Sequence, residues 1–304
     1  MAHDHARDTA PSGRGRLAIA LGITSVVLVA EIVGSIITGS LALLVDAVHM
    51  LTDAGGLAIA LTAASLVGRP ATGKRTWGFS RAEVLGATAQ AAILLAVGIF
   101  VLVEAVQRLF DPPEIAGPQL VIFGLIGLLG NVASIAVLAS GRNTNLNLRA
   151  AFLEVLNDAL GSVAVIVAAI VIALTGWQFA DPVAALVIGA IILPRAFLLL
   201  KETTSVLLES TPHGLDLDSV REHLLRLPHV LSVHDLHASQ IATGLPVLTA
   251  HVVVDNSCFY DGHAPQMLDE LQQCVAEHFA VRMEHSTFQL ELASHSEHEH
   301  PTHT

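Results

Sequence analysis

Charged residues are scarce in this sequence: they make up 14% of its 304 residues, against about 25% in typical soluble domains. Hydrophobic residues make up 53%. A soluble α/β protein of this length is the competing class, and the lengths of the apolar runs argue against it. Six runs are each long enough to cross a hydrocarbon core of about 30 Å as a helix, at residues 17–38, 41–67, 83–109, 119–140, 150–174 and 183–200. The sequence therefore predicts an α-helical membrane protein with six transmembrane helices.

Basic residues are almost absent from the C-terminal third of the chain. From Ser205 onward there are 14 acidic and only 3 basic residues. This acidity excludes nucleic acid as a partner, because binding to phosphate requires a basic surface. Elsewhere, Lys and Arg cluster in the N-terminal tail and in the loops after the second, fourth and sixth runs. Because Lys and Arg favour the cytoplasmic side, we predict a multi-pass protein of the cell inner (plasma) membrane with both termini in the cytoplasm.

Cysteine is equally scarce, since Cys258 and Cys274 are the only two and no C-x-x-C spacing occurs. A disulfide is not expected in a cytoplasmic domain, so we predict two buried, unreactive thiols. The sequence also contains no H-E-x-x-H motif, and no extra base or nucleophile accompanies the polar residues of the apolar runs. These absences argue against an intramembrane metalloenzyme.

The composition changes abruptly around Glu209, and the sequence divides into four segments. A polar cytoplasmic tail, residues 1–16, precedes a six-helix transmembrane domain, residues 17–204. In the cytoplasmic domain, residues 205–292, helical and strand patterns follow in the order αββαβ, which predicts a compact α+β sandwich. Residues 293–304 are a low-complexity, His-rich tail, for which we expect disorder and weak metal binding.

Four ionisable residues within the apolar runs form two matched pairs. His49 and Asp53 are spaced i, i+4, and so are Glu154 and Asp158. This spacing puts both members of a pair on the same face of a helix. A charge at the centre of a bilayer costs about 3 kcal/mol on insertion scales, whereas one imidazole and three carboxylates can form a tetrahedral site for a divalent cation. Interhelical hydrogen bonds are the alternative, which two matched pairs disfavour.

The remaining polar residues of the apolar runs are predicted to have structural roles. Asp46 lies near the start of the second run, where a helix dipole favours an anion. We therefore expect Asp46 to serve helix-end electrostatics or an outer gate rather than direct metal ligation. Glu31, Glu104 and Asn131 are single groups, which are expected to bridge helices.

Resemblance to a known family is carried by six stretches of the sequence. GSLALLVDAVHMLTDAGGLAIAL and RAAFLEVLNDALGSVAVI resemble the second and fifth spans of the cation diffusion facilitator family, and WGFSRAEVLGA resembles the entry to its third span. VHDLHASQ, LTAHVVVD and HSTFQLE resemble parts of its cytoplasmic domain. The resemblance covers residues 17–292 and points to the bacterial cobalt–zinc–cadmium resistance type and its animal zinc-transporter relatives. It implies a homodimer of six-span protomers in the lipid bilayer, a ferredoxin-like cytoplasmic domain, and export of a divalent metal cation in exchange for protons.

The resemblance also implies which residues bind the transported ion. The family's ligands fall on His49, Asp53, Glu154 and Asp158. Zinc-transporting members commonly carry His at the position of Glu154, and a carboxylate is a harder ligand than imidazole. Zinc remains the expected ion, with cobalt, cadmium, nickel and manganese as alternatives. No metal site is expected in the loop GRPATGKRTWGFSRAE, which lacks Asp and His.

Histidines of the cytoplasmic domain form a second candidate site. The resemblance implies a regulatory zinc site formed by His234, His251, His285 and Glu291, with a weaker case for His263. Gln289 stands where some relatives have His, and its amide is a poor ligand, which argues against a full two-metal cluster. Simple exposure to solvent is the alternative for each histidine. We expect bound metal to tighten the dimer and to bias the transport cycle.

These residues together predict a proton-coupled antiporter that exports divalent cations from the cytoplasm by alternating access, and not an enzyme. On the outer side, protons compete with the metal for His49 and the carboxylates, because only deprotonated ligands bind a metal. A membrane metal sensor that signals through the cytoplasmic domain is the second hypothesis. Matched ligand pairs at mid-membrane favour transport, because a sensor does not require them.

Overall fold

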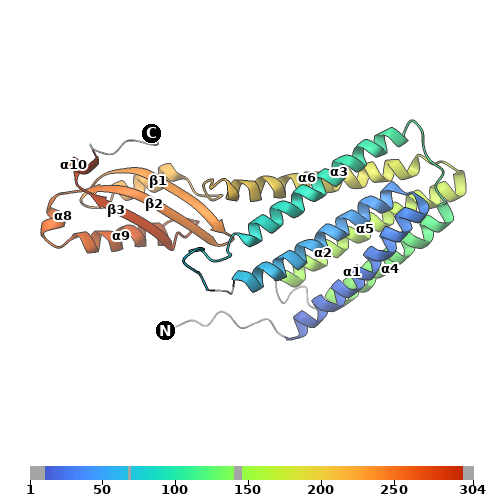
Figure 1. Cartoon of the computed structure of the whole chain (residues 1–304), viewed down its shortest axis with the longest axis horizontal. Coiled ribbons are helices and arrows are strands. Elements are labelled where there is room, and N and C mark those ends of the chain that lie inside the picture. The colour runs from blue at the N-terminus through green and yellow to red at the C-terminus, as the bar shows by residue number, and fades with distance from the viewer. Residues whose placement is uncertain (1–10, 68–69, 140–145, 297–304) are drawn as a thin grey trace. The chain divides into compact units, whose positions relative to one another are not determined.

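The computed structural model describes the backbone of residues 11–67, 70–139 and 146–296. Side chains are described for residues 18–52, 54–55, 70–139 and 152–295. The chain divides into two compact units, one formed by residues 1–59 with 89–200 and the other by residues 60–88 with 201–304. Figure 1 shows the long helices of the first unit and the small sheet of the second.

Six long helices correspond to the six apolar runs (Figure 1). They are α1 Pro11–Thr38, α2 Leu41–Val67, α3 Ala82–Arg108, α4 Gly117–Ala139, α5 Leu146–Thr175 and α6 Ala180–Leu207. Among the described residues, five of these helices are long and apolar enough to cross a membrane, and α2 contributes an apolar stretch at Leu41–Thr52. The predicted helical membrane architecture is therefore confirmed. Helix α1 begins earlier than its apolar run, at Pro11, where a proline is well tolerated because the first helical residue needs no backbone donor.

Small residues allow the helices of the first unit to approach one another closely. A Cβ atom at Gly117 of α4 would lie 3.0 Å from the backbone nitrogen of Ala173 on α5. A Cβ atom at Gly189 of α6 would lie 3.3 Å from the Leu102 side chain on α3. Because lipid removes the hydrophobic drive for helices to associate, close van der Waals packing of this kind holds membrane helices together.

Apolar side chains also cover the outside of these helices. Only 17% of the apolar span of α3 is buried, and 39% of that of α5. Ile36 of α1 is 77% exposed and Leu174 of α5 is 80% exposed. A surface of this kind is unfavourable in water and requires lipid around it, in agreement with a membrane domain.

The turn between α1 and α2 is held by the start of α6. Gly39 in this turn has a φ of +70°, a conformation that favours glycine. The Asp181 carboxylate accepts hydrogen bonds from the backbone nitrogens of Leu41, at 2.8 Å, and Ala42, at 3.3 Å, and from the Ser40 hydroxyl. Asp181 therefore caps the first turn of α2, the helix-end role that was expected for Asp46.

The described C-terminal residues of the second unit, 208–296, form a three-stranded sheet and two larger helices. Their elements are α7 Leu217–Leu225, β1 Val230–Ala242, β2 Leu245–Val254, α8 Ser257–Tyr260, α9 Ala264–Glu277, β3 His285–Glu291 and α10 Ala293–Ser296. The predicted order αββαβ is confirmed, with the short helices α8 and α10 added. Strand β2 lies between β1, to which it is antiparallel, and β3, to which it is parallel. The parallel pair needs a long crossover connection, which contains α9.

One face of the sheet packs against α7 and α9. Leu248 and Val252 of β2 are at most 1% exposed and belong to one apolar cluster with Leu224 of α7 and Leu271 of α9. Because side chains alternate between the faces of a strand, His251 points to the opposite face. The helices therefore leave that second face to the polar residues of the candidate site.

Both cysteines lie in the core of the second unit. Cys258 is 1% and Cys274 3% exposed, and both are free thiols. Burial raises the pKa of each thiol, so both remain protonated and unreactive near neutral pH. The predicted pair of buried, inert thiols is confirmed.

The two predicted tails are only partly described. Residues 1–10 and 297–304 lie outside the described residues. Residues Ala293–Ser296 form α10, which packs against β2, so the start of the predicted disordered tail is helical. At the other end, α1 includes residues 11–16 of the predicted N-terminal tail.

Candidate metal-binding sites

The first candidate site lies between α2 and α5. His49 Nε2 is 3.7 Å from Asp158 Oδ1 and 4.0 Å from Glu154 Oε1. Ligand atoms around a tetrahedral zinc ion are about 3.3 Å apart, so a small inward movement brings these side chains to coordinating distance. His49 is 7% and Asp158 3% exposed. The structure thus brings together three of the four residues of the predicted intramembrane set.

Asp53 is the fourth member of that set, and its side chain lies outside the described residues. Its backbone belongs to α2, one turn after His49. Between them, the Thr52 hydroxyl donates a hydrogen bond to the His49 carbonyl oxygen at 2.7 Å. This back-bond within the helix satisfies the buried hydroxyl without using a ligand atom of His49.

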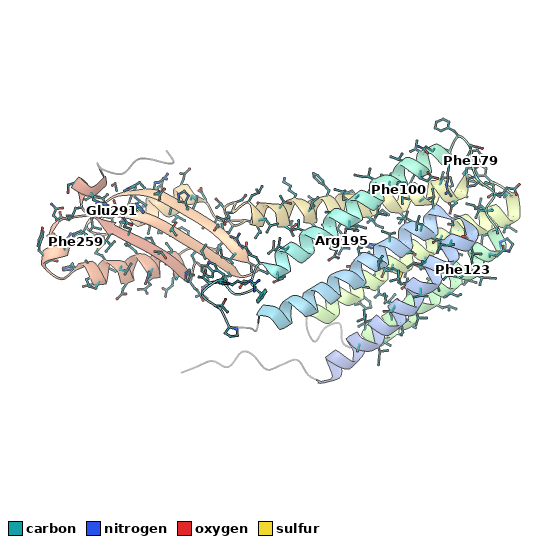
Figure 2. The ribbon with its side chains drawn as sticks, in the orientation of Figure 1. Phe100, Phe123, Phe179, Arg195, Phe259 and Glu291 are labelled. Carbon is teal, nitrogen blue, oxygen red and sulfur yellow. The ribbon has the colours of Figure 1, made fainter. Side chains whose placement is uncertain are left out.

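Arg195 of α6 is a member of this site that the ligand spacing alone does not identify. Its Nη1 and Nη2 atoms donate to the two carboxylate oxygens of Glu154, at 3.1 and 2.8 Å. This is a bidentate ion pair, the strongest geometry for Arg and a carboxylate. Figure 2 marks Arg195 on α6. The signal in the sequence was the Arg itself, because an ionisable residue within an apolar run indicates a partner of opposite charge.

The other polar residues of the membrane helices only partly follow the predicted roles. Asn131 of α4 bridges helices, since its Nδ2 donates to Ser162 Oγ of α5 at 3.2 Å. Glu104 instead pairs with Arg108 of its own helix at 3.0 Å, so the bridge expected for Glu104 is wrong. Spacing i, i+4 favours this local pair over a partner on another helix.

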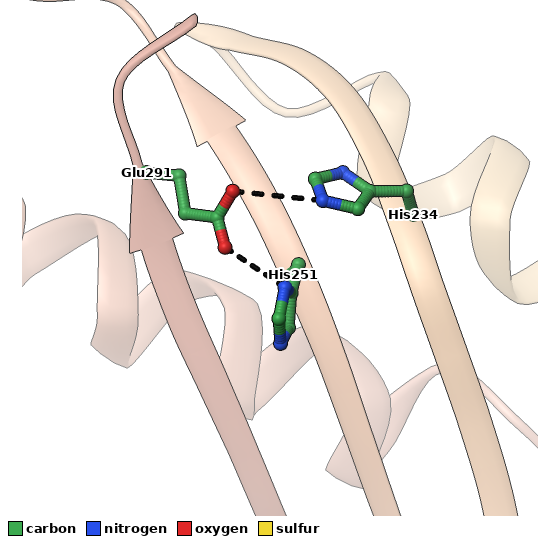
Figure 3. A group of neighbouring side chains, drawn as sticks. All are labelled: His234, His251 and Glu291. Carbon is green, nitrogen blue, oxygen red and sulfur yellow. Dashed lines mark ion pairs between the residues drawn. The ribbon is translucent and has the colours of Figure 1, made fainter. Parts of the chain in front are cut away.

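The second candidate site lies on the face of the sheet opposite α7 and α9, where Glu291 is 3% exposed. His234 and His251 are direct partners in the β1–β2 ladder, and their ring centroids are 5.3 Å apart. Glu291 of β3 lies between them: its Oε1 is 2.8 Å from His251 Nδ1 and its Oε2 is 3.5 Å from His234 Nε2 (Figure 3). One ligand atom from each residue lies within 4.8 Å of the others. Two imidazoles and a carboxylate at this separation match the donor set that zinc takes in proteins.

Asp235 extends this cluster, although no feature of the sequence singled it out as a ligand. A register shift between His234 and His237 interrupts the β1–β2 ladder, and Asp235 at this bulge has a φ of +47°. One carboxylate oxygen of Asp235 is 2.9 Å from His237 Nε2, and the other is 3.8 Å from His251 Nε2. Bulges re-aim side chains near functional sites, and here the bulge turns a second carboxylate toward His251.

His285 does not belong to the cytoplasmic cluster, contrary to the set implied by the resemblance. It pairs with Val247 at the start of β3, whereas Glu291 pairs with Val253 at its end. Six residues of strand separate the two positions by about 20 Å. The His285 ring instead packs edge-on against Trp77, with the centroids 4.8 Å apart. His285 is therefore a packing residue in this structure.

Family models match nearly the whole chain. The model of the cation efflux transmembrane domain matches residues 17–208, and that of the cation efflux protein cytoplasmic domain matches residues 212–293. The chain belongs to the cation diffusion facilitator family. The two matched ranges contain the six membrane helices and the three-stranded sheet, respectively, so each of the family's domains carries one candidate site.

Relatives within the family are similar along most of their length. The metal cation efflux system protein CzcD of Cupriavidus metallidurans is 44% identical over 292 residues, which cover 96% of this chain and 89% of the relative. The zinc transporter ZitB of Escherichia coli is 37% identical over 297 residues, which cover 96% and 93%. The cadmium, cobalt and zinc/H(+)-K(+) antiporter of Bacillus subtilis is 34% identical over 271 residues, which cover 88% and 86%. This member of the family is thus a metal cation efflux transporter and not an enzyme.

Proposed function

We propose that the protein is a homodimeric, proton-coupled antiporter that exports zinc from the cytoplasm across the inner membrane, with both termini in the cytoplasm. The transported ion binds His49, Asp53, Glu154 and Asp158. The observation that carries this proposal is the approach of His49 to Asp158 and Glu154 in a buried part of the membrane unit. The name of the Escherichia coli relative specifies zinc, and that of the Bacillus subtilis relative specifies cadmium, cobalt and zinc. Both names support the choice of ion.

The charges of the site support a divalent cargo. The three carboxylates and the Arg195 guanidinium leave two negative charges, which one divalent cation neutralises. Arg195 thus offsets the additional negative charge that Glu154 brings where zinc-transporting relatives commonly carry His. A neutral loaded site is the least costly state in which the helices can rearrange within lipid, because a net buried charge carries a large desolvation penalty.

The same residues provide a route for proton coupling. Imidazole titrates close to neutral pH, and a metal binds only the deprotonated forms of His and carboxylate ligands. Protons that enter from the outside therefore displace the metal from His49 and its neighbours. The emptied, protonated site returns to the cytoplasmic side and releases the protons there, which completes the exchange.

Zinc flux into proteoliposomes tests this proposal directly. When a proton gradient is imposed, we expect wild-type protein to move zinc in the direction opposite to the flow of protons. When zinc is added on one side, we expect protons to flow toward that side. The measurement uses a zinc-sensitive and a pH-sensitive dye in parallel, with protein-free liposomes as the control. Zinc flux that does not respond to the proton gradient would contradict the antiport mechanism.

We further propose that His234, His251 and Glu291 hold a regulatory zinc ion that tightens the dimer. The double variant His234→Ala/His251→Ala is expected to lose one zinc per chain while the transport site still binds zinc, and to weaken dimerisation about tenfold. Equilibrium dialysis of the full-length protein counts the bound zinc, and analytical ultracentrifugation measures the dimer dissociation constant.

The matched control for this experiment is His223→Ala/His278→Ala. These two histidines belong to the same unit, with ring centroids 5.7 Å apart, and His223 also packs edge-on against the aromatic ring of Phe279. Their removal is expected to leave zinc binding unchanged. Equal zinc content and equal dimer affinity in wild type and the His234→Ala/His251→Ala variant would refute the regulatory site.

A further inference from the structure

A second cluster of polar residues is buried in the membrane unit beside the candidate transport site. It consists of Glu31 of α1, Asp46 of α2, Asn131 of α4 and Ser162 of α5. All four residues are at most 1% exposed. Asp46 precedes His49 by one turn of α2, and Ser162 follows Asp158 by one turn of α5. On these helices the cluster is therefore displaced from the transport site by about 5 Å.

Only part of this cluster is joined by hydrogen bonds. Asn131 Nδ2 donates to Ser162 Oγ at 3.2 Å, and Ser162 Oγ donates to Asp46 Oδ2 at 3.4 Å. Both carboxylate oxygens of Glu31 and Asn131 Oδ1 are buried and have no hydrogen-bond partner among the described residues. Buried polar atoms are normally paired, so three unpaired oxygens in one cluster indicate a ligand.

Two glycines provide the space into which these oxygens point. A Cβ atom at Gly127 of α4 would lie 2.6 Å from Glu31 Oε1 and 3.1 Å from Ser162 Oγ. A Cβ atom at Gly161 of α5 would lie 2.5 Å from Asp46 Oδ1. Any other residue at either position would collide with a carboxylate. The glycines thus allow Glu31 and Asp46 to turn inward from two helices.

The apolar parts of the helices that form the cluster contain no positive charge to balance these carboxylates. No Lys or Arg occurs in residues 17–67, 117–141 or 150–175. Arg195 of α6 is engaged with Glu154. The ionisable groups that act on Glu31 are Asp46 of α2 and Asp158 of α5, both acidic, and α4 supplies none. Buried carboxylates that repel one another require a cation, because an uncompensated charge in lipid is strongly unfavourable.

The donors of the cluster are all oxygen atoms, from carboxylate, amide and hydroxyl groups. Hard cations prefer such donors, whereas zinc prefers a site that includes imidazole, which His49 provides one turn away. A second divalent ion so close to the first would be repelled strongly. These considerations favour a hard monovalent cation in the cluster.

We propose that Glu31 and Asp46, with Asn131 and Ser162, form a second intramembrane site that binds a monovalent counter-cation, H⁺ or K⁺, in addition to the protons that displace the metal from the transport site. This proposal rests on the proposed metal antiport. The cation bound at this second site compensates the negative charge of the carboxylates of the membrane unit when the metal has left His49 and Asp158. Both candidate ions bind through the same oxygens, and the H(+)-K(+) exchange named for the Bacillus subtilis relative involves the same two cations.

The test compares zinc flux by wild type and Glu31→Gln in proteoliposomes under two separate gradients. One arm applies a pH gradient without K⁺, and the other a K⁺ gradient at equal pH. We expect Glu31→Gln to lower flux at least about tenfold in the arm that drives wild type, while zinc binding to the detergent-solubilised protein is retained. The arm in which Glu31→Gln loses flux relative to wild type identifies the cation that the second site binds.

Glu104→Gln is the matched control, because it removes a membrane glutamate that pairs with Arg108 away from the cluster. It is expected to leave gradient-driven flux unchanged. Gly127→Ala is measured alongside as a second test of the site. Alanine favours a helix, and its methyl group displaces the Glu31 carboxylate. The site is therefore tested even if Glu31→Gln does not fold. Gradient-driven flux at the wild-type level in Gly127→Ala and in folded Glu31→Gln overturns this site, whereas failure of wild type itself to move zinc overturns the proposed antiport.

Discussion

Replacement of Asp158 by asparagine is expected to reduce zinc flux at least about 100-fold, because loss of a direct ligand costs more than loss of the groups that orient ligands. The substitution keeps the shape of the side chain and removes only its charge. Asp158 is 3% exposed and lies 3.7 Å from His49 Nε2, so water cannot readily replace the missing oxygen. The measurement is zinc and proton movement in proteoliposomes, and both are expected to be lost together.

Asn157→Ala is the matched control for this prediction. Asn157 is the neighbouring polar residue of α5 and is exposed rather than directed into the bundle. Its replacement is expected to leave flux unchanged, and comparison of both variants separates the loss of a ligand from a general disturbance of the helix. Zinc flux by Asp158→Asn close to that of wild type would show that α5 does not supply this ligand.

Replacement of Glu154 by histidine is expected to lower zinc flux about tenfold or more, although histidine is the residue that zinc-transporting relatives commonly carry there. The reason is Arg195, whose guanidinium forms a bidentate pair with Glu154. With histidine at position 154, Arg195 loses this partner and leaves a positive charge beside the metal. Zinc-binding affinity, measured by titration of the purified protein, is expected to fall with the flux.

The double variant Glu154→His/Arg195→Gln decides whether charge is the cause. It removes both members of the ion pair, so the two remaining carboxylates balance one divalent cation. We expect zinc flux to recover toward the wild-type level, with cobalt transport lowered relative to zinc because imidazole is a softer ligand than carboxylate. With the single variant Arg195→Gln added, the variants form a complete double-mutant cycle, which gives the interaction free energy between positions 154 and 195. If the double variant is no better than Glu154→His, Arg195 does not act through charge.

The helices and the strand order were predictable because their signals are local. A run such as residues 119–140 is long enough for lipid and contains no charge, which leaves a transmembrane helix as the way to satisfy its backbone. The pairing of His49 with Asp53 and of Glu154 with Asp158 follows from 3.6 residues per turn, whatever surrounds the helix. The β-rich stretches VLSVHDLHASQI and PVLTAHVVVD likewise indicated that His234 and His251 lie on strands.

The partners of these residues were not predictable, because each depends on which elements pack together. His285 matched a family position, but the register of β3 places it at the opposite end of the strand from Glu291. Glu31, Asp46 and Asn131 appeared to be isolated polar residues in three different runs. The packing of α4 against α1 and α5 brings Glu31 and Asn131 into one buried cluster with Ser162, and Ser162 in turn contacts Asp46 of α2.

The sequence by itself determined a six-helix membrane protein with a small α+β domain, and two acidic or His-containing ligand pairs at helical spacing. Those features follow from hydrophobicity and backbone periodicity, which act within a single element. Only the tertiary structure decided that Glu154 is bound to Arg195 and that Glu31 is buried beside the carboxylates of Asp46 and Asp158. Such relations join residues that are distant along the chain, and their energies depend on burial and separation, which the order of residues does not specify.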